Sequence, residues 1–393
     1  MKKHPIFFLI AGILSLIIAM GIGRFAYTPI LPLMQNALGF SEAFAGYLAA
    51  SNYMGYLIGA ILASILPLHN RRIFYLRISL LASIITTLMM GVVHSYFFML
   101  LIRLISGIAS AFIFVFASSI VLDKLAESNK THWSGYFYSG VGFGIFFSTL
   151  FIPRFNKLFH WEGAWIGLAF LSGFLLFFIW LWLKESPNAE KKFIGQKVRL
   201  KTPPRKWLPW LIAAYGLEGL GYIVTGTFIV SIAEETGIFQ EPSIVWAVVG
   251  LAAIPSCVIW SELAKKWGFV ISLAVSMILQ SIGIVLPVFW LTKTSFIMSA
   301  ILFGATFMGI TTLATTLARQ ISPSNSSRVI GMMTANYAFG QMIGPIIAGL
   351  LLTYTHSFHS SLLGAGSAVF LGGLLLLSGI RFERSNRNET ITE

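Results

Sequence analysis

Long apolar runs separated by short polar segments dominate the pattern along the chain. Twelve of these runs are about 20 residues or longer, the length that an α-helix needs to cross the ~30 Å hydrocarbon core of a membrane. We therefore predict an all-α membrane protein with twelve transmembrane helices. They cover residues 6–34, 44–66, 73–93, 96–121, 133–153, 163–183, 207–232, 243–263, 269–290, 294–318, 329–354 and 361–380.

One long polar segment, residues 184–206, interrupts this pattern. It carries eight basic and two acidic residues and three prolines, which is typical of a solvated linker. Six predicted spans lie on each side of it. We therefore expect an N-terminal six-helix bundle over 1–183 and a C-terminal one over 207–393, the latter ending in a short cytoplasmic tail.

The two halves share local patterns, which indicates an internal duplication. Gly21-x-Gly23 in the first span recurs 198 positions later as Gly219-x-Gly221 in the seventh. Glycines of the fifth span are also matched, at an offset of 196, by glycines of the eleventh. Repeats of this kind are common in transporters and predict two pseudo-symmetric bundles.

Composition and charge agree with a membrane protein. The chain is 56% hydrophobic and 10% charged, so it lacks the polar surface of a soluble domain. The net charge of +13 would fit a nucleic-acid partner, but its distribution argues against one. With both termini in the cytoplasm, cytoplasmic segments hold 22 Lys and Arg residues and the opposite loops hold three. This asymmetry follows the positive-inside rule, so we expect the lipid bilayer and no nucleic acid as partner.

The first span resembles a signal peptide at its start, since Lys2 and Lys3 precede a short apolar core ending near Ala19. The apolar pattern continues through Arg24 to Met34, so we expect no cleavage. The single cysteine excludes an intrachain disulfide, and the seven histidines mostly lie at span ends. We expect neither an enzyme with catalytic residues nor a metal or other cofactor.

Two charged residues lie deep inside predicted spans. Arg24 is a permanent cation in the first span, and Glu218 is an acid about eleven residues into the seventh. Charges at this depth normally face protein or water rather than lipid. A guanidinium can bind a carboxylate through two parallel hydrogen bonds, which makes Arg24 our first candidate for substrate binding. A structural arginine bonded to backbone carbonyls or to Glu218 is the alternative.

Further polar residues within the spans complete the candidate site. Arg103 in the fourth span is a candidate for binding or proton coupling, with a helix-packing arginine as the alternative. Four more residues are candidates for the site. Tyr27 is close to Arg24 in the first span, and Tyr222 in the seventh span aligns with Arg24 in the repeat. Asn336 and Tyr337 are adjacent residues of the glycine-rich eleventh span. Helix-to-helix hydrogen bonds would also explain such residues without any ligand.

The chain resembles the major facilitator superfamily over essentially its whole length. Three patterns carry the resemblance: the loop segment from Ala63 to Arg72 with its echo at 261–268, Arg103-x-x-Ser106-Gly107 in the fourth span, and Gly340-x-x-x-Gly344-Pro345-x-x-x-Gly349 in the eleventh. The resemblance implies a bacterial inner-membrane carrier that works as a monomer. It also implies that the first and seventh spans line opposite sides of one cavity, so that Arg24 and Glu218 could pair across it.

The chain also departs from the superfamily's patterns. The loop segment has Pro67 where the superfamily has an acid, and its echo has Lys265 there, so a charged latch between helices is in doubt. Glu262 could substitute for the acid, and a peripheral acid at the cytoplasmic face is the alternative. The fifth span lacks the proline near Gly144 that drug–proton antiporters usually have, which weakens a multidrug-exporter interpretation.

These observations predict a secondary transporter that moves a small organic solute by alternating access, with an anionic substrate favoured by two arginines against one glutamate. The absence of a phosphate-binding loop in the sequence favours an ion gradient, and we expect protons. In the coupling hypothesis, protonation of Glu218 frees Arg24 for the substrate. The alternatives are a static ion pair between the bundles, proton-driven efflux of amphipathic or cationic compounds, and a receptor or scaffold without transport.

Overall fold

The computed structural model describes residues 5–65, 71–130, 133–183, 203–322 and 326–384, and every regular element in these ranges is helical. The first half contains α1 (Pro5–Leu16), the π-helix η1 (Ile17–Ile22), α2 (Tyr27–Leu38), α3 (Glu42–Ile65), α4 (Arg72–Met90), α5 (Tyr96–Glu127) and α6 (Ser134–Trp182). The second half contains the 3₁₀ turn η4 (Arg205–Trp207), α7 (Leu208–Glu235), α8 (Ile244–Trp267), α9 (Phe269–Phe289), α10 (Lys293–Ile321), α11 (Ser326–Thr355), α12 (Phe358–Leu377) and α13 (Ile380–Arg384).

Each predicted span lies on helical segments, apart from a few residues at the ends. The first span is divided among α1, η1 and α2. Ten helical segments of the described ranges are long and apolar enough to cross a membrane, two fewer than the predicted twelve. One difference is α6, which holds two predicted spans and breaks only at Phe159 and His160, where the backbone angles are not helical. The other is α3, which carries Ser51, Asn52 and three tyrosines and is not among the ten.

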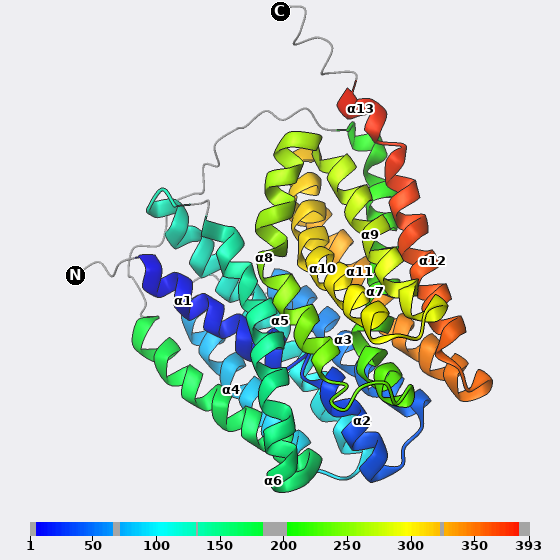
Figure 1. Cartoon of the computed structure of the whole chain (residues 1–393). Coiled ribbons are helices and arrows are strands. Elements are labelled where there is room, and N and C mark those ends of the chain that lie inside the picture. Colours follow the sequence, from blue (N-terminus) through cyan, green and yellow to red (C-terminus); the bar gives the residue numbers. More distant parts are fainter. Residues whose placement is uncertain (1–4, 66–70, 131–132, 184–202, 323–325, 385–393) are drawn as a thin grey trace, which may run out of the picture.

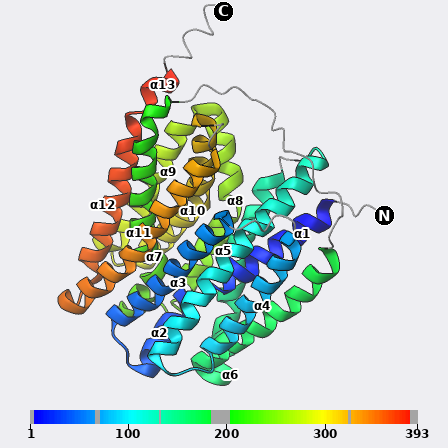
Figure 2. The ribbon, with the colours of Figure 1, turned by 180° about the vertical axis from the view of Figure 1, so that it is seen from behind.

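The helices form two groups that follow the order of the chain (Figures 1 and 2). In the first group α5 packs against α3 and α4, and α1 packs against α6; in the second, α10 packs against α8 and α9, and α12 against α7 and α9. The groups meet where α3 contacts α11, α6 contacts α8 and α2 contacts α7. Residues 184–202 and 385–393, which hold most of the predicted linker and tail, lie outside the described ranges, so the domain limits stay a prediction.

Glycines permit the closest helix approaches in both groups. A Cβ atom added at Gly107 of α5 would overlap the backbone carbonyl oxygen of Asn52 on α3, and one at Gly21 would overlap the backbone of Gly144 on α6. Small residues at such contacts bring helix backbones together where lipid supplies no hydrophobic drive between helices. The predicted glycine motifs are therefore packing sites.

We expect Gly107→Ala to lower the midpoint of thermal unfolding by several degrees, because the added methyl group would push α5 away from α3. Gly173→Ala is the matched control, since a Cβ atom there meets no atom within 4 Å. The measurement is thermal unfolding of both purified variants in one detergent. Equal midpoints for the two variants would show that the α3–α5 contact is looser than the structure has it.

Candidate functional site

Arg24 lies where the first predicted span is interrupted. The π-helix η1 ends at Ile22, and a turn over residues 23–26 precedes α2. Backbone bonds from Gly23 N–H to the Ile18 carbonyl (2.8 Å) and from Phe25 N–H to the Met20 carbonyl (2.9 Å) reach back five residues, which widens the helix before the turn. Such π segments and broken helices are frequent at functional sites of membrane transporters.

Pro29 explains how the interruption contacts the second group of helices. Proline has no N–H group, so the carbonyl of Phe25, four residues earlier, lacks its helical donor. The indole Nε1 of Trp246 on α8 donates a hydrogen bond to that carbonyl (3.1 Å), and Thr28 Oγ1 donates to the carbonyl of Gly226 on α7. The segment that carries Arg24 is thereby bonded directly to the other half of the molecule.

The guanidinium of Arg24 is held among aromatic rings. Its Cζ lies 4.4 Å from the ring centroid of Tyr56, 4.8 Å from that of Tyr53 and 5.3 Å from that of Phe25, and the residue is 3% exposed. Such cation–π contacts stabilise a buried cation. The Nε and Nη2 atoms, however, have no hydrogen-bond partner in the described part of the chain. One edge of this buried cation is therefore free to bind an anion.

Glu218 is buried on α7 without a compensating cation. It has no exposed surface, and neither carboxyl oxygen makes a hydrogen bond of good geometry within the described ranges. Gln280 on α9 and Tyr337 on α11 lie against the carboxyl group. Because burial of an unpaired carboxylate is very costly, this environment suits the neutral carboxylic acid.

The predicted ion pair between Arg24 and Glu218 is absent among the described residues, whose ion pairs include neither side chain. The reason is the position of the tyrosines. Two tyrosines of the second half act electrostatically on Arg24: Tyr222, one turn after Glu218 on α7, and Tyr337 on α11. Both tyrosines also interact with Glu218. The two charges therefore face the same tyrosines rather than each other.

A column of nearly parallel rings forms this part of the second half. Tyr215 and Tyr337 stack at 4.3 Å, Tyr337 and Tyr222 at 5.5 Å, and Tyr222 and Phe307 at 5.2 Å, with interplanar angles of 13°, 13° and 24°. The amide of Gln341 donates to the Tyr222 hydroxyl. Sequence reasoning selected Tyr222 and Tyr337 but missed Tyr215 and Phe307, because only the packing of three helices aligns these rings.

Arg103 holds the interruption in place. Its Nη1 donates to the carbonyl of Gly23 (3.2 Å) and its Nε donates to that of Leu48 (3.4 Å). Ser106, in the same predicted motif, also donates to Gly23 (3.2 Å). The Tyr27 ring, 4.6 Å from the Arg103 Cζ, completes this environment. Arg103 therefore lies where it can position the turn that carries Arg24.

Two other predicted site residues join helices through backbone carbonyls. The Tyr27 hydroxyl donates to Ala45 on α3 (2.9 Å), and the Asn336 amide donates to Ile212 on α7 (2.8 Å). These bonds fit the alternative interpretation of helix-to-helix packing. They also fasten α2 to α3 and α11 to α7, the helices that carry the site.

The family model described as "Uncharacterised MFS-type transporter YbfB" matches residues 16–377. The chain belongs to this family. The resemblance to the major facilitator superfamily is thus confirmed, and the protein is a multi-pass membrane transporter of a superfamily whose members carry small molecules.

Individual relatives are distant but match along most of their length. "Uncharacterized MFS-type transporter YceJ" of Bacillus subtilis (strain 168) is 22% identical over 365 residues, which cover 88% of this chain and 89% of the relative. "Tetracycline resistance protein, class H" of Pasteurella multocida is 22% identical over 401 residues, 96% of each chain. The class G protein of Vibrio anguillarum is 24% identical over 349 residues, 84% of this chain and 86% of the relative.

The solved structures support the fold. The crystal structure of the nucleoside transporter NupG matches with a TM-score of 0.72 at 16% identity and covers 95% of this chain and 98% of NupG. At this identity the likeness shows the fold alone. It establishes a major-facilitator arrangement for this member of the YbfB-type family.

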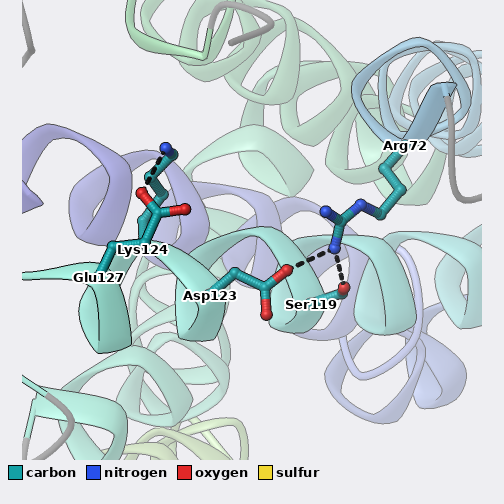
Figure 3. Close-up of polar contacts among 5 residues, drawn as sticks. All are labelled: Arg72, Ser119, Asp123, Lys124 and Glu127. Carbon is teal, nitrogen blue, oxygen red and sulfur yellow. Dashed lines mark hydrogen bonds and ion pairs between the residues drawn. The ribbon is translucent and has the colours of Figure 1, made fainter. Parts of the chain in front are cut away.

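The loop motif of this family member is only partly within the described ranges, since Pro67 lies outside them. Figure 3 shows that Arg72, at the end of the motif, contacts Asp123 and Ser119 of α5, each at 2.6 Å. A charged contact between helices is thus present, with its acid on α5 rather than in the loop. Glu262 instead pairs with Lys265 on its own exposed helix turn, which fits the peripheral alternative.

Proposed function

We propose that the protein is a proton-coupled secondary transporter that moves a small organic anion across the bacterial inner membrane by alternating access. The observation that carries the proposal is the free guanidinium edge of Arg24, buried at the boundary between the two halves. A buried cation with two free donors is unfavourable unless an anion occupies them for part of the cycle. The positive-inside distribution favours cytoplasmic termini, and a monomer suffices because both halves belong to one chain.

Contacts at one end of the site support alternating access. Beyond Arg24, Asn36 on α2 donates to Glu234 on α7 (2.8 Å), in addition to the Thr28 and Trp246 bonds across the same boundary. The predicted topology places Asn36 and Glu234 at the outer side. The structure thus fits a state closed toward the outside. These bonds are among the contacts that must break for the outer side to open.

Glu218 supplies the proposed proton site. A neutral Glu218 is compatible with its buried surroundings and would not bind Arg24. This fits the structure, in which the two side chains are not paired. In its ionised form it would attract a nearby cation, and Arg24 shares Tyr222 and Tyr337 as neighbours with Glu218. Loss of the proton would therefore compete with anion binding, which couples the two events.

The proposal is tested in liposomes that contain the purified protein and have an acidic and an alkaline side. We expect these liposomes to accumulate labelled organic anions on the alkaline side well above protein-free liposomes, which report passive leakage. Dissipating the pH gradient with a protonophore should remove the difference. Accumulation equal to that of protein-free liposomes for every anion offered would contradict the proposal.

Efflux of amphipathic compounds is the second candidate function, because two of the relatives are named tetracycline resistance proteins. In this version the aromatic column contacts the apolar part of the exported compound and Glu218 its cationic group. Expression in a tetracycline-sensitive strain separates the candidates: a raised inhibitory concentration favours efflux, and an unchanged one favours the anion transporter.

A further inference from the structure

The geometry around Arg24 restricts the kind of anion that can bind. The Tyr53 and Tyr56 rings pack against the guanidinium, so a ligand has to approach this cation at its edge. The free donors Nε and Nη2 belong to one edge and point in the same direction. Two oxygens of a planar carboxylate match such an edge with two parallel hydrogen bonds.

The charges near the site restrict the anion further. Arg103 acts electrostatically on Arg24, and its Nε and Nη1 donate to backbone carbonyls, while its Nη2 has no partner within the described ranges. Of these two arginines, only Arg24 presents two free donors on one edge, so the site binds one carboxylate in this way. A dianion would leave its second charge among buried aromatic rings, which is strongly unfavourable. The site thus favours a monoanion.

The aromatic column indicates the rest of the ligand. Tyr222 and Tyr337 are the column members that act electrostatically on Arg24, so this part of the column lies near the cation. Its rings are nearly parallel to one another, and its three tyrosines are all buried. Because Tyr222 and Tyr337 each stack with other rings of the column, they offer a ligand their ring edges. A flat aromatic ring gains edge-to-face contacts from these edges, and a puckered aliphatic ring of the same size does not.

We infer that the substrate is a monocarboxylate joined to a flat aromatic ring, with the carboxylate on Arg24 and the ring against Tyr222 and Tyr337. This inference rests on the proposed function, since it names the substrate class of the same site. It adds selectivity for planar ligands, which the proposed function does not require.

Four small probes test the inference by ligand-induced thermal stabilisation and fluorescence titration of the purified, full-length protein. Benzoate has the expected charge and ring. Cyclohexanecarboxylate keeps the charge but is not flat, benzamide keeps the ring but is neutral, and phthalate adds a second carboxylate. We expect benzoate to bind at least about tenfold more tightly than each of the other three.

A variant of the column separates ring recognition from charge recognition. Tyr337→Leu should reduce the ratio of benzoate to cyclohexanecarboxylate affinity toward one, because it removes a flat wall and leaves Arg24 in place. Phe170→Leu is the control, since Phe170 is 73% exposed and lies on α6, a helix that contributes no ring to the column. It should keep the wild-type ratio. If Tyr337→Leu does not fold, the ranking of the four probes by the wild type decides alone.

The outcomes are distinguishable. Equal affinity for benzoate and cyclohexanecarboxylate would overturn the aromatic inference and leave the organic-anion transporter standing. Equal or tighter binding of phthalate or benzamide would overturn the monoanion argument. Failure of both carboxylates to bind, together with failure of anion accumulation in liposomes, would overturn the proposed function itself.

Discussion

Arg24→Lys is expected to weaken benzoate binding by about 10- to 100-fold, although it keeps the positive charge. Lysine carries a compact ammonium group and cannot present two parallel donors on one edge. It also loses the planar contact with the Tyr53 and Tyr56 rings. Fluorescence titration of the purified variants measures the change directly.

The matched control for this substitution is Arg154→Lys. Arg154 is exposed, and its Nη1 donates to the carbonyl of Leu150 within its own helix (3.0 Å). This variant should bind benzoate as the wild type does. If Arg24→Lys also kept the wild-type affinity, the free edge of Arg24 would not be the anion site, and the structural interpretation of Arg24 would be preferred.

Glu218→Gln is expected to abolish proton-driven accumulation while leaving substrate exchange intact. Glutamine has nearly the shape of a protonated glutamate, so the buried surroundings of Gln280 and Tyr337 accept it, but it cannot release a proton. In liposomes, uptake of labelled benzoate driven by a pH gradient should fall to the level of protein-free liposomes. Exchange of internal unlabelled for external labelled benzoate should continue.

Glu262→Gln is the control for this effect, because Glu262 is exposed and pairs with Lys265 on the same helix. It should retain gradient-driven accumulation. If Glu218→Gln accumulated benzoate as well as Glu262→Gln does, Glu218 would have no part in coupling.

Much of the architecture could be predicted because its causes are local. A run of about 20 apolar residues is sufficient to define a membrane-spanning segment, and the predicted spans lie on helical segments. The two deep charges were equally evident, since Arg24 and Glu218 stand alone in apolar runs. The break between the fifth and sixth spans was also predicted, since the kink of α6 at Phe159 and His160 falls between residues 153 and 163. The interruption of the first span at residues 23–26 was not predicted.

The details of the site depend on contacts between distant segments. Nothing near Arg24 in sequence indicates that Tyr53 and Tyr56 of α3 enclose its guanidinium, or that Trp246 replaces the donor that Pro29 lacks. The aligned repeats suggested a direct pair between Arg24 and Glu218. The pair does not form because the tyrosines, whose orientation follows from helix rotation and packing, stand beside both charges.

The central claim is that a proton on Glu218 and an anion on Arg24 favour each other, and the pH dependence of benzoate affinity tests it most directly. For the wild type, the dissociation constant should rise by up to about tenfold per pH unit above the pH at which Glu218 loses its proton. The dissociation constant of Glu218→Gln should stay, across the same pH range, at the low value that the wild type has at acidic pH. A wild-type affinity that does not change with pH, or the same pH slope in Glu218→Gln, would contradict the account.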